Sequence, residues 1–422
     1  MTGSRRELSL ADAVGIGING VVGSGIYLLV GPLARVGGGA SVFGVLACGF
    51  LCILIALCFA ELSSMYDRSG GPYVYARDAF GPVVGFGVGW LGMATGVLGL
   101  AAVASGFAGA LARFLPALMP FRPGVAAALI GALGLINYLG VKKGGRTSTL
   151  LSIAKLAPLV AVALAGLRFA PRAALRWDGE GIVSAAFLSI FMMSGFEYAA
   201  VPAGEVRDAR RNVPIAIVGS IAFASLLYAL LQLATLGALP EAFRHEQPLP
   251  DVAARVLGGW AGPLLAATAV VSMLGFCAGV AIVAPRYFTA LAEDGYLPPV
   301  LAERSRFGTP GAAILVASAF AAGLSVALGY VALVDVSNLV ILSGYALTCL
   351  ATLVLRARKP DIPRGIRLPL GIPVLATAAA LSLLVAAKPR LAEWTFSLVL
   401  LVAGFLAWAL TALSRRERAP QP

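Results

Sequence analysis

Apolar residues recur along the chain in runs of about 20, separated by short segments rich in charge, glycine and proline. Each run is long enough to cross about 30 Å of hydrocarbon as a helix that rises 1.5 Å per residue. No polar segment is long enough to fold as a separate domain. The pattern therefore predicts an all-α integral membrane protein built as one bundle of twelve transmembrane helices. The predicted spans are 10–34, 40–64, 79–110, 122–140, 147–168, 182–203, 213–238, 260–287, 310–330, 334–356, 368–387 and 393–413.

Composition and charge support a membrane protein. The 422 residues are 59% hydrophobic and 12% charged, with a mean hydropathy of +0.90, which excludes an ordinary water-soluble domain. The net charge of +12 does not indicate a nucleic-acid partner, because the basic residues lie in alternate loops. If Arg5 and Arg6 are cytoplasmic, inside segments hold about twice as many Lys and Arg residues as outside ones. We therefore expect both termini on the cytoplasmic side of the cell membrane.

Few residues offer catalytic or metal-binding chemistry. The five cysteines lie inside predicted spans, where cysteine usually acts as a small buried hydrophobic residue. His245 is the single histidine and has no ligand cluster around it in the sequence. A phosphate-binding loop with the spacing Gly-x-x-x-x-Gly-Lys-Ser/Thr does not occur. We therefore expect no cofactor, no metal and no enzymatic activity.

Two predicted spans contain glycine-rich interruptions. The first carries GINGVVGSGIYLLV at residues 17–30, and the sixth carries IVSAAFLSIFMMSGFEYAAVP at residues 182–202, with Ser194-Gly195 near its middle. Interrupted spans in corresponding positions are typical of transporters built from inverted repeats, with substrate bound near the midplane. Close helix packing through small residues is the alternative explanation.

An unwound helix exposes backbone groups that can bind a zwitterion. N–H groups at Gly23, Ser24 and Gly25 suit a carboxylate, because they begin a half-helix. Carbonyl groups of Val21 and of the 191–194 stretch suit an α-amine. The sequence therefore predicts a binding site for an amino acid between the two interruptions.

Three ionisable residues stand inside predicted spans or at their ends, where a charge is costly and functional roles are common. Glu197 follows the second interruption, Glu61 lies at the inner end of the second span, and Lys155 lies in the fifth. Lys155 could exchange a proton or act as a fixed positive charge in place of a sodium ion. The alternatives are an interfacial position for Glu61 and a Lys155 side chain that reaches the surface.

Four motifs at these residues resemble the amino acid–polyamine–organocation superfamily of secondary transporters, and the resemblance covers essentially the whole chain. They are GSGI at 23–26, FAEL at 59–62 with SGGPYVY at 69–75, FMMSGFE at 191–197 with GEVRDARRNVP at 204–214, and RYFTALAEDGYLP at 286–298.

The resemblance implies a leucine-transporter-like fold in one domain covering residues 1–422. Helices 1–5 (about 10–168) and 6–10 (about 182–356) would be inverted repeats with broken helices 1 and 6, and two further helices would follow at about 368–413. Phe191 would close over the substrate, and Lys155 and Glu197 would take part in coupling or gating. The expected substrate-binding residues are Val21, Gly23, Ser24, Gly25, Ile26, Phe191, Met193, Ser194 and Gly195.

The substrate class is read from the remaining spans. Residues 92–98 and 275–280 are small or apolar, which favours small neutral amino acids. Lys155 favours proton-coupled symport or exchange over sodium symport. The sequence of the sixth span also resembles that of arginine–agmatine exchangers, so an antiporter of cationic amino acids or polyamines remains an alternative function. A channel is the alternative from a different class of membrane protein. Expected partners are the lipid bilayer and an amino acid or amine, with the protein a monomer or homodimer.

Overall fold

The structure is a computed structural model of the chain, and it describes residues 7–140, 155–172, 174–245, 248–328, 330–386 and 391–418. Within these residues, β-type pairing is confined to one isolated parallel bridge between Leu8 and Val206. The all-α prediction is therefore confirmed for the described residues. The α-helices are α1 (Leu10–Val21), α2 (Gly25–Gly37), α3 (Ser41–Ser63), α4 (Pro72–Phe80), α5 (Pro82–Phe114), α6 (Arg122–Tyr138), α8 (Gly179–Met193), α9 (Ala209–Ala238), α10 (Leu249–Leu257), α11 (Ala261–Glu293), α12 (Gly311–Ala327), α13 (Tyr330–Arg358), α14 (Gly371–Ala386) and α15 (Leu391–Arg418), and residues 155–166 are also helical.

The helices are long and apolar enough for a multi-pass membrane protein. Eight stretches of the described residues meet this condition, and the first, Leu10–Ser63, contains α1, α2 and α3. Two shorter apolar helices, Gly311–Ala327 and Gly371–Ser382, coincide with the predicted spans 310–330 and 368–387. Residues 147–154 of the predicted fifth span lie outside the described residues.

Local sequence explains where several helices begin. Ser9 and Asp12 form a capping box at the start of α1, in which each side chain accepts a hydrogen bond from the other residue's backbone N–H. Asp178 caps α8 by accepting bonds from the backbone of its first turn. Pro72 and Pro82 stand in the first turns of α4 and α5, where a missing N–H has no cost.

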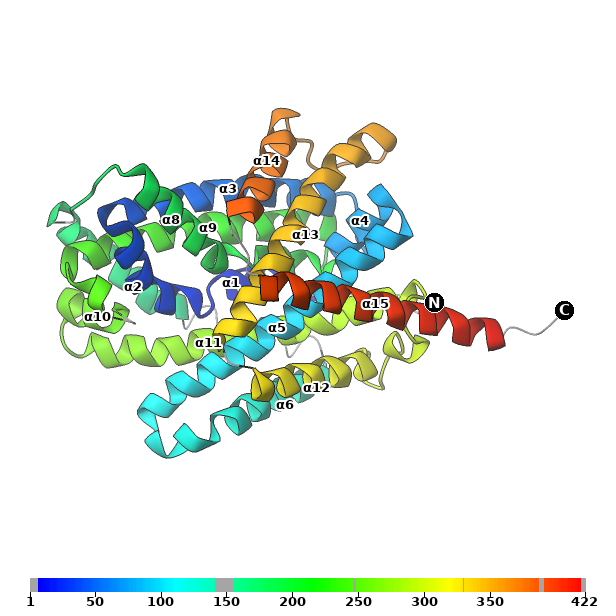
Figure 1. Cartoon of the computed structure of the whole chain (residues 1–422), viewed down its shortest axis with the longest axis horizontal. Helices are drawn as coiled ribbons and strands as arrows, with labels where there is room; N and C mark the ends of the chain where they lie inside the picture. The colour runs from blue at the N-terminus through cyan, green and yellow to red at the C-terminus, as the bar shows by residue number, and fades with distance from the viewer. Residues whose placement is uncertain are drawn as a thin grey trace.

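Two groups of helices pack side by side. The first contains α1, α2, α3, α8 and α9, and the second contains α5, α6, α11 and α12, while α13 packs against both α3 and α5 (Figure 1). Helix α1 contacts α11 across the boundary between the groups. The two helix interruptions therefore lie where the groups meet.

Both predicted interruptions are present. Helix α1 ends at Val21 and α2 begins at Gly25. Helix α8 ends at Met193, and Gly195 adopts a φ of 107°, in the left-handed region that favours glycine. Beyond its break the predicted span 182–203 continues as short 3₁₀ helices, η4 (Phe196–Ala200) and η5 (Ala203–Glu205), and Gly179–Ala200 is long and apolar enough to cross a membrane. Pro202, between these two turns, has no N–H to continue a helix.

Candidate functional site

The two helix breaks lie directly against each other. A Cβ atom on Gly20 would stand 2.3 Å from the carbonyl oxygen of Gly195, and one on Gly195 would stand 2.3 Å from that of Gly20. A Cβ on Gly25 would stand 2.7 Å from the Cβ of Met192. Glycine is required at this crossing because the backbones approach too closely for any side chain. The close-packing explanation and the binding-site prediction are thus compatible.

A narrow cavity lies at the crossing. It collects seven of the nine predicted substrate-binding residues, namely Val21, Gly23, Ser24, Gly25, Phe191, Ser194 and Gly195. Ile26 and Met193 are fully buried and do not line it. Met193 instead faces Ser225, whose hydroxyl lies 3.6 Å from the methionine sulfur. The remaining walls come from α1, α5, α11, α13 and the second break, with the lining residues Gly20, Thr95, Gly99, Ala102, Val103, Tyr198, Phe276, Ser337 and Ile341.

The start of α2 gives one end of this cavity a preference for anions. The first backbone N–H groups of a helix have no partner within the helix, and they stand at the positive end of its dipole. In α2 the N–H groups of Tyr27 and Leu28 donate to the Ser24 carbonyl, which leaves those of Gly25 and Ile26. Ile26 can therefore contribute its backbone although its side chain faces the core. A carboxylate at this end would therefore be stabilised by backbone groups alone.

Two carbonyl groups expected to bind a substrate amine already have donors within the chain. The Tyr228 hydroxyl donates to the Val21 carbonyl over 3.0 Å. The Ser194 hydroxyl donates to the Phe191 carbonyl over 2.9 Å. A carbonyl oxygen has two lone pairs, so the Phe191 carbonyl keeps one acceptor position. The Val21 carbonyl also accepts from the backbone N–H of Gly23 over 2.9 Å, so both of its lone pairs are already used. The sequence did not indicate these internal partners.

Lys155 is fully buried beside the first break. Its ammonium group donates a hydrogen bond to the carbonyl oxygen of Val22, which the end of α1 leaves without a helical partner. The hydroxyl of Ser272 on α11 lies 3.0 Å and 2.9 Å from the carbonyl oxygens of Val22 and Gly23. The side chain does not reach the surface. Lys155 therefore places its amino group against a backbone oxygen at the break.

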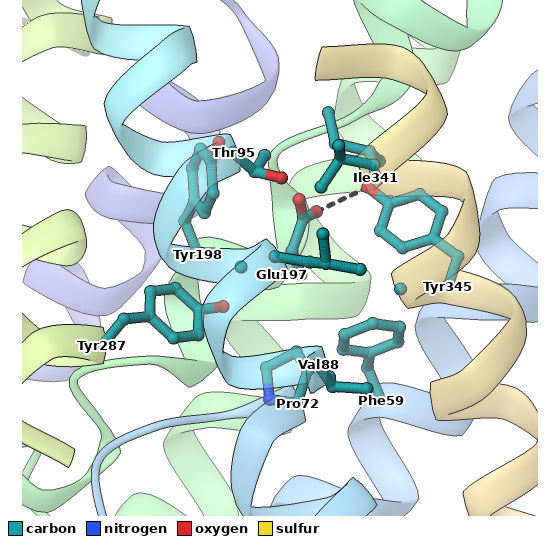
Figure 2. Close-up of a pocket in the computed structure, with 13 residues that line it drawn as sticks. Phe59, Pro72, Val88, Thr95, Glu197, Tyr198, Tyr287, Ile341 and Tyr345 are labelled. Carbon is teal, nitrogen blue, oxygen red and sulfur yellow. Dashed lines mark hydrogen bonds between the residues drawn. The ribbon is translucent and has the colours of Figure 1, made fainter. Parts of the chain in front are cut away.

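Glu197 lines a second narrow chamber, which shares Thr95, Tyr198 and Ile341 with the first cavity. Figure 2 shows its carboxylate pointing toward the Tyr345 ring from α13. The Tyr345 hydroxyl donates to Glu197 Oε2 over 2.6 Å, and the backbone N–H of Gly195 donates to the same oxygen over 2.9 Å. A buried carboxylate is thereby held next to the break.

Ion pairs lie at the end of the bundle that holds the start of α1 and the last turns of α3 and α11. This end is here called the N-terminal end. Glu205 accepts two bonds of 3.1 Å from Arg286, and both side chains are buried. Glu61 is fully buried and bonded to Arg356, with Arg364 Nε at 3.6 Å. The ion pair with α13 compensates for the burial of the Glu61 carboxylate.

A third cluster at the N-terminal end surrounds Asp294, directly after α11. Its carboxylate accepts from Arg68 over 2.5 Å and also from Tyr73 and Arg77. Burial alone would raise the pKa of Asp294, but the hydrogen bonds from Tyr73 and Arg77 and the charge of Arg68 outweigh it and lower the pKa below its usual value. The Asp294 carboxylate therefore stays ionised and ties α4 to α11.

Several cavity residues were missed by sequence reasoning. Thr95 and Phe276 lie in the two stretches that indicated a small apolar lining, and Tyr198 directly follows Glu197. Tyr345 carried no local signal, because it reaches Glu197 only through the packing of α13. Among the described residues, no group of three or more His, Cys, Asp and Glu side chains is placed to hold a metal ion.

Comparison with known proteins agrees with these features. The sequence model of a family described as "Amino acid permease" matches residues 8–412. An uncharacterised transporter of Mycobacterium tuberculosis is 31% identical over 90% of this chain and 87% of its own. The methylthioribose transporter of Bacillus subtilis is 26% identical over 89% and 86% of the two chains.

The human b(0,+)-type amino acid transporter 1 is 27% identical over 97% of this chain and 88% of its own. These relatives are transporters of amino acids or of another organic solute. The family match covers both helix breaks, Lys155 and the ion pairs of the N-terminal end. The chain therefore belongs to the amino acid permease family, within the amino acid–polyamine–organocation superfamily of transporters.

Proposed function

We propose that this protein is a sodium-independent secondary transporter that moves small neutral amino acids across the cell membrane by alternating access. The observation that carries the proposal is the cavity between the two breaks, with helix-start N–H groups at one end. Its side-chain walls are uncharged and consist of small, apolar and aromatic residues. A zwitterion with a small neutral side chain fits this chemistry.

Sodium independence is supported by Lys155. Its ammonium group binds the Val22 carbonyl, a backbone oxygen at the break that could otherwise coordinate a cation. A buried lysine can also lose and regain a proton as its surroundings change, which supports proton-coupled symport or exchange. Phe191 lines the cavity next to α2 and is proposed to close over the substrate.

The proposed architecture is a five-plus-five inverted repeat within a single domain of twelve spans. The first repeat would cover about 10–168 and the second about 182–356, with two further helices at about 368–413. Both termini are proposed to be cytoplasmic because of the distribution of Lys and Arg residues. The N-terminal end of the bundle would then face the cytoplasm.

A cationic amino acid or polyamine is the second candidate substrate. The observation that favours it is Glu197, whose carboxylate lines the chamber adjoining the cavity. A substrate long enough to extend past Tyr198 would bring a positive group toward this carboxylate.

Uptake into proteoliposomes tests both candidates. Purified protein is reconstituted and offered labelled glycine, alanine, leucine, phenylalanine, arginine and putrescine, with and without a pH gradient and internal substrate. We expect alanine uptake that is unchanged when external sodium is replaced by potassium. Uptake of arginine or putrescine alone would favour the second candidate, and a sodium requirement would contradict the role of Lys155.

A further inference from the structure

Exposed arginines lie where α9 begins beside the segment 359–370, which joins α13 to α14. Arg210 and Arg211 stand in the first turn of α9, and Arg367 lies in the joining segment. A Cβ atom on Gly365 would stand 3.6 Å from the carbonyl oxygen of Arg210, so the two segments meet. The three exposed arginines are here called the arginine patch.

The charge of this region is not neutralised by its own acids. Residues 207–211 and 359–370 together hold six basic residues and two aspartates. Arg364 turns inward to backbone carbonyl groups, and Lys359 pairs with an aspartate of α4. Within the residues that the structure describes, the arginine patch forms no ion pair with a carboxylate. Its guanidinium groups are therefore open to an anion from outside the chain.

The arginine patch lies at the ends of helices that cross the membrane. Helix α9 and the stretch Leu339–Arg358 of α13 are both long and apolar enough to do so. Ile215 follows Arg211 by one turn on the same face of α9 and is 45% exposed, and Leu370 follows Arg367 by three residues and is 64% exposed. Exposed apolar side chains on such helices face lipid tails, and arginines next to them reach the headgroup level.

The segment that carries Arg367 is held in place from inside the bundle. The hydroxyl oxygen of Ser64, directly after α3, accepts hydrogen bonds from the N–H groups of Gly365 and Ile366 over 3.1 Å and 3.3 Å. Glu61 Oε2 accepts one from the N–H group of Leu368 over 3.0 Å. Both neighbours of the outward-facing arginine are thus fixed, so binding there orders little additional backbone.

We propose that the arginine patch binds the phosphate headgroup of an anionic phospholipid, whose acyl chains would lie against α9 and α14. The planar guanidinium group matches phosphate oxygens with paired hydrogen bonds. In the proposed orientation the patch faces the cytoplasmic leaflet, where anionic lipids attract basic segments. None of the three arginines lines the cavity between the breaks, so this site is separate from the proposed substrate site.

The double variant Arg211→Gln/Arg367→Gln removes one charge from each of the two segments. Both side chains are exposed, so the fold should persist. The matched control, Arg304→Gln/Arg306→Gln, removes the same charge from the exposed segment between α11 and α12. A second variant, Arg211→Lys/Arg367→Lys, keeps both charges.

The experiment uses purified protein in a neutral detergent. It is titrated with dioleoyl phosphatidylglycerol, with phosphatidylcholine of the same chains, or with inorganic phosphate. The melting temperature is recorded, and native mass spectrometry measures bound lipid. We expect phosphatidylglycerol alone to raise the melting temperature. In the double glutamine variant, the concentration that gives half of this shift should rise about tenfold or more, whereas the control and the lysine variant should change less than about threefold.

Each other outcome overturns the site. An unmodified protein that does not respond to phosphatidylglycerol, a glutamine variant that responds normally, or a control that loses as much would each do so. A shift with inorganic phosphate alone would assign the patch to a free anion and contradict the lipid. If the double variant does not fold, Arg367→Gln is titrated instead, and a normal response of that protein overturns the proposal. These measurements involve no uptake, so their failure leaves the proposed function in place.

Discussion

Gly20 and Gly195 face each other so closely that a Cβ on either one would stand 2.3 Å from the carbonyl oxygen of the other. One belongs to α1 and the other to the break after α8. The contact joins two segments that lie far apart in the sequence, and it brings both helix breaks to one cavity. Glycine has a low helix propensity, but its lack of a side chain allows the two backbones to come closer than any other residue would permit.

Gly20→Ala should separate the two breaks. The new methyl group must displace backbone atoms, so we expect destabilisation of about 1–3 kcal/mol and loss of uptake. The melting temperature in detergent and alanine uptake measure the two effects. The control is Gly131→Ala on α6, where an added Cβ meets no atom within 4 Å. Equal behaviour of the two variants would show that the crossing does not depend on glycine.

Lys155→Met should remove the positive charge at the first break while keeping an unbranched side chain. We expect greatly reduced uptake and a changed pH dependence, because the Val22 carbonyl loses its ammonium donor. Ser272→Ala removes a hydroxyl from the same carbonyl without changing charge, and its pH profile should be normal. Uptake is measured from pH 5 to 8. A Lys155→Met protein with the unmodified pH profile would exclude a coupling role.

Glu197→Gln separates the charge of this residue from its hydrogen bonds. The glutamine oxygen can still accept from Tyr345 and from the backbone of Gly195, so the local structure should persist. If the carboxylate takes part in coupling, uptake should lose its dependence on a pH gradient while substrate still shifts the melting temperature. Tyr345→Phe removes a donor and keeps the charge, and gradient dependence should remain. Retained gradient dependence in Glu197→Gln would contradict the assigned role.

Glu205→Gln should be strongly destabilising. It leaves the buried Arg286 without its ionised partner, and breaking a buried ion pair in this way costs about 3–5 kcal/mol. Thermal melting in detergent measures the loss. The exposed pair of Arg255 and Glu241 is the matched comparison, and Glu241→Gln should have little effect. A small effect of Glu205→Gln would mean that Asn137 and the Ile282 carbonyl alone satisfy Arg286.

The contribution of the Asp294 cluster to stability should fall as the pH is lowered. The pKa of Asp294 is lowered in the folded protein, so its contribution to stability is present above the unfolded pKa of about 3.9 and is lost as the pH falls through the folded value. Asp294→Asn should therefore lower the melting temperature at pH 7, and the difference should shrink below about pH 4. Asp361→Asn, at an exposed position between α13 and α14, is the control. A difference that stays constant with pH would exclude the carboxylate as the cause.

The interior of the membrane explains why much of the fold is visible in the sequence. Each span must be apolar and about 20 residues long, so the runs along the chain predicted helices that the described residues contain. Glycine in such a run marks a place where the helix can open, and Gly25 and Gly195 do lie at the breaks. The sequence motifs also contain Glu205 and Arg286, but the sequence did not indicate that these two residues form an ion pair.

Which residues meet was decided by tertiary structure alone. Tyr345 reaches Glu197 because α13 packs beside α5 and α3, and the cavity walls at Gly99 and Phe276 come from α5 and α11. Likewise, Met193 faces Ser225 although its position in the break suggested the cavity. Periodicity and glycine content are local properties and specify helices and their interruptions. The partners of a buried charge and the width of a cavity depend on how helices distant in sequence pack, and only the folded bundle determines that.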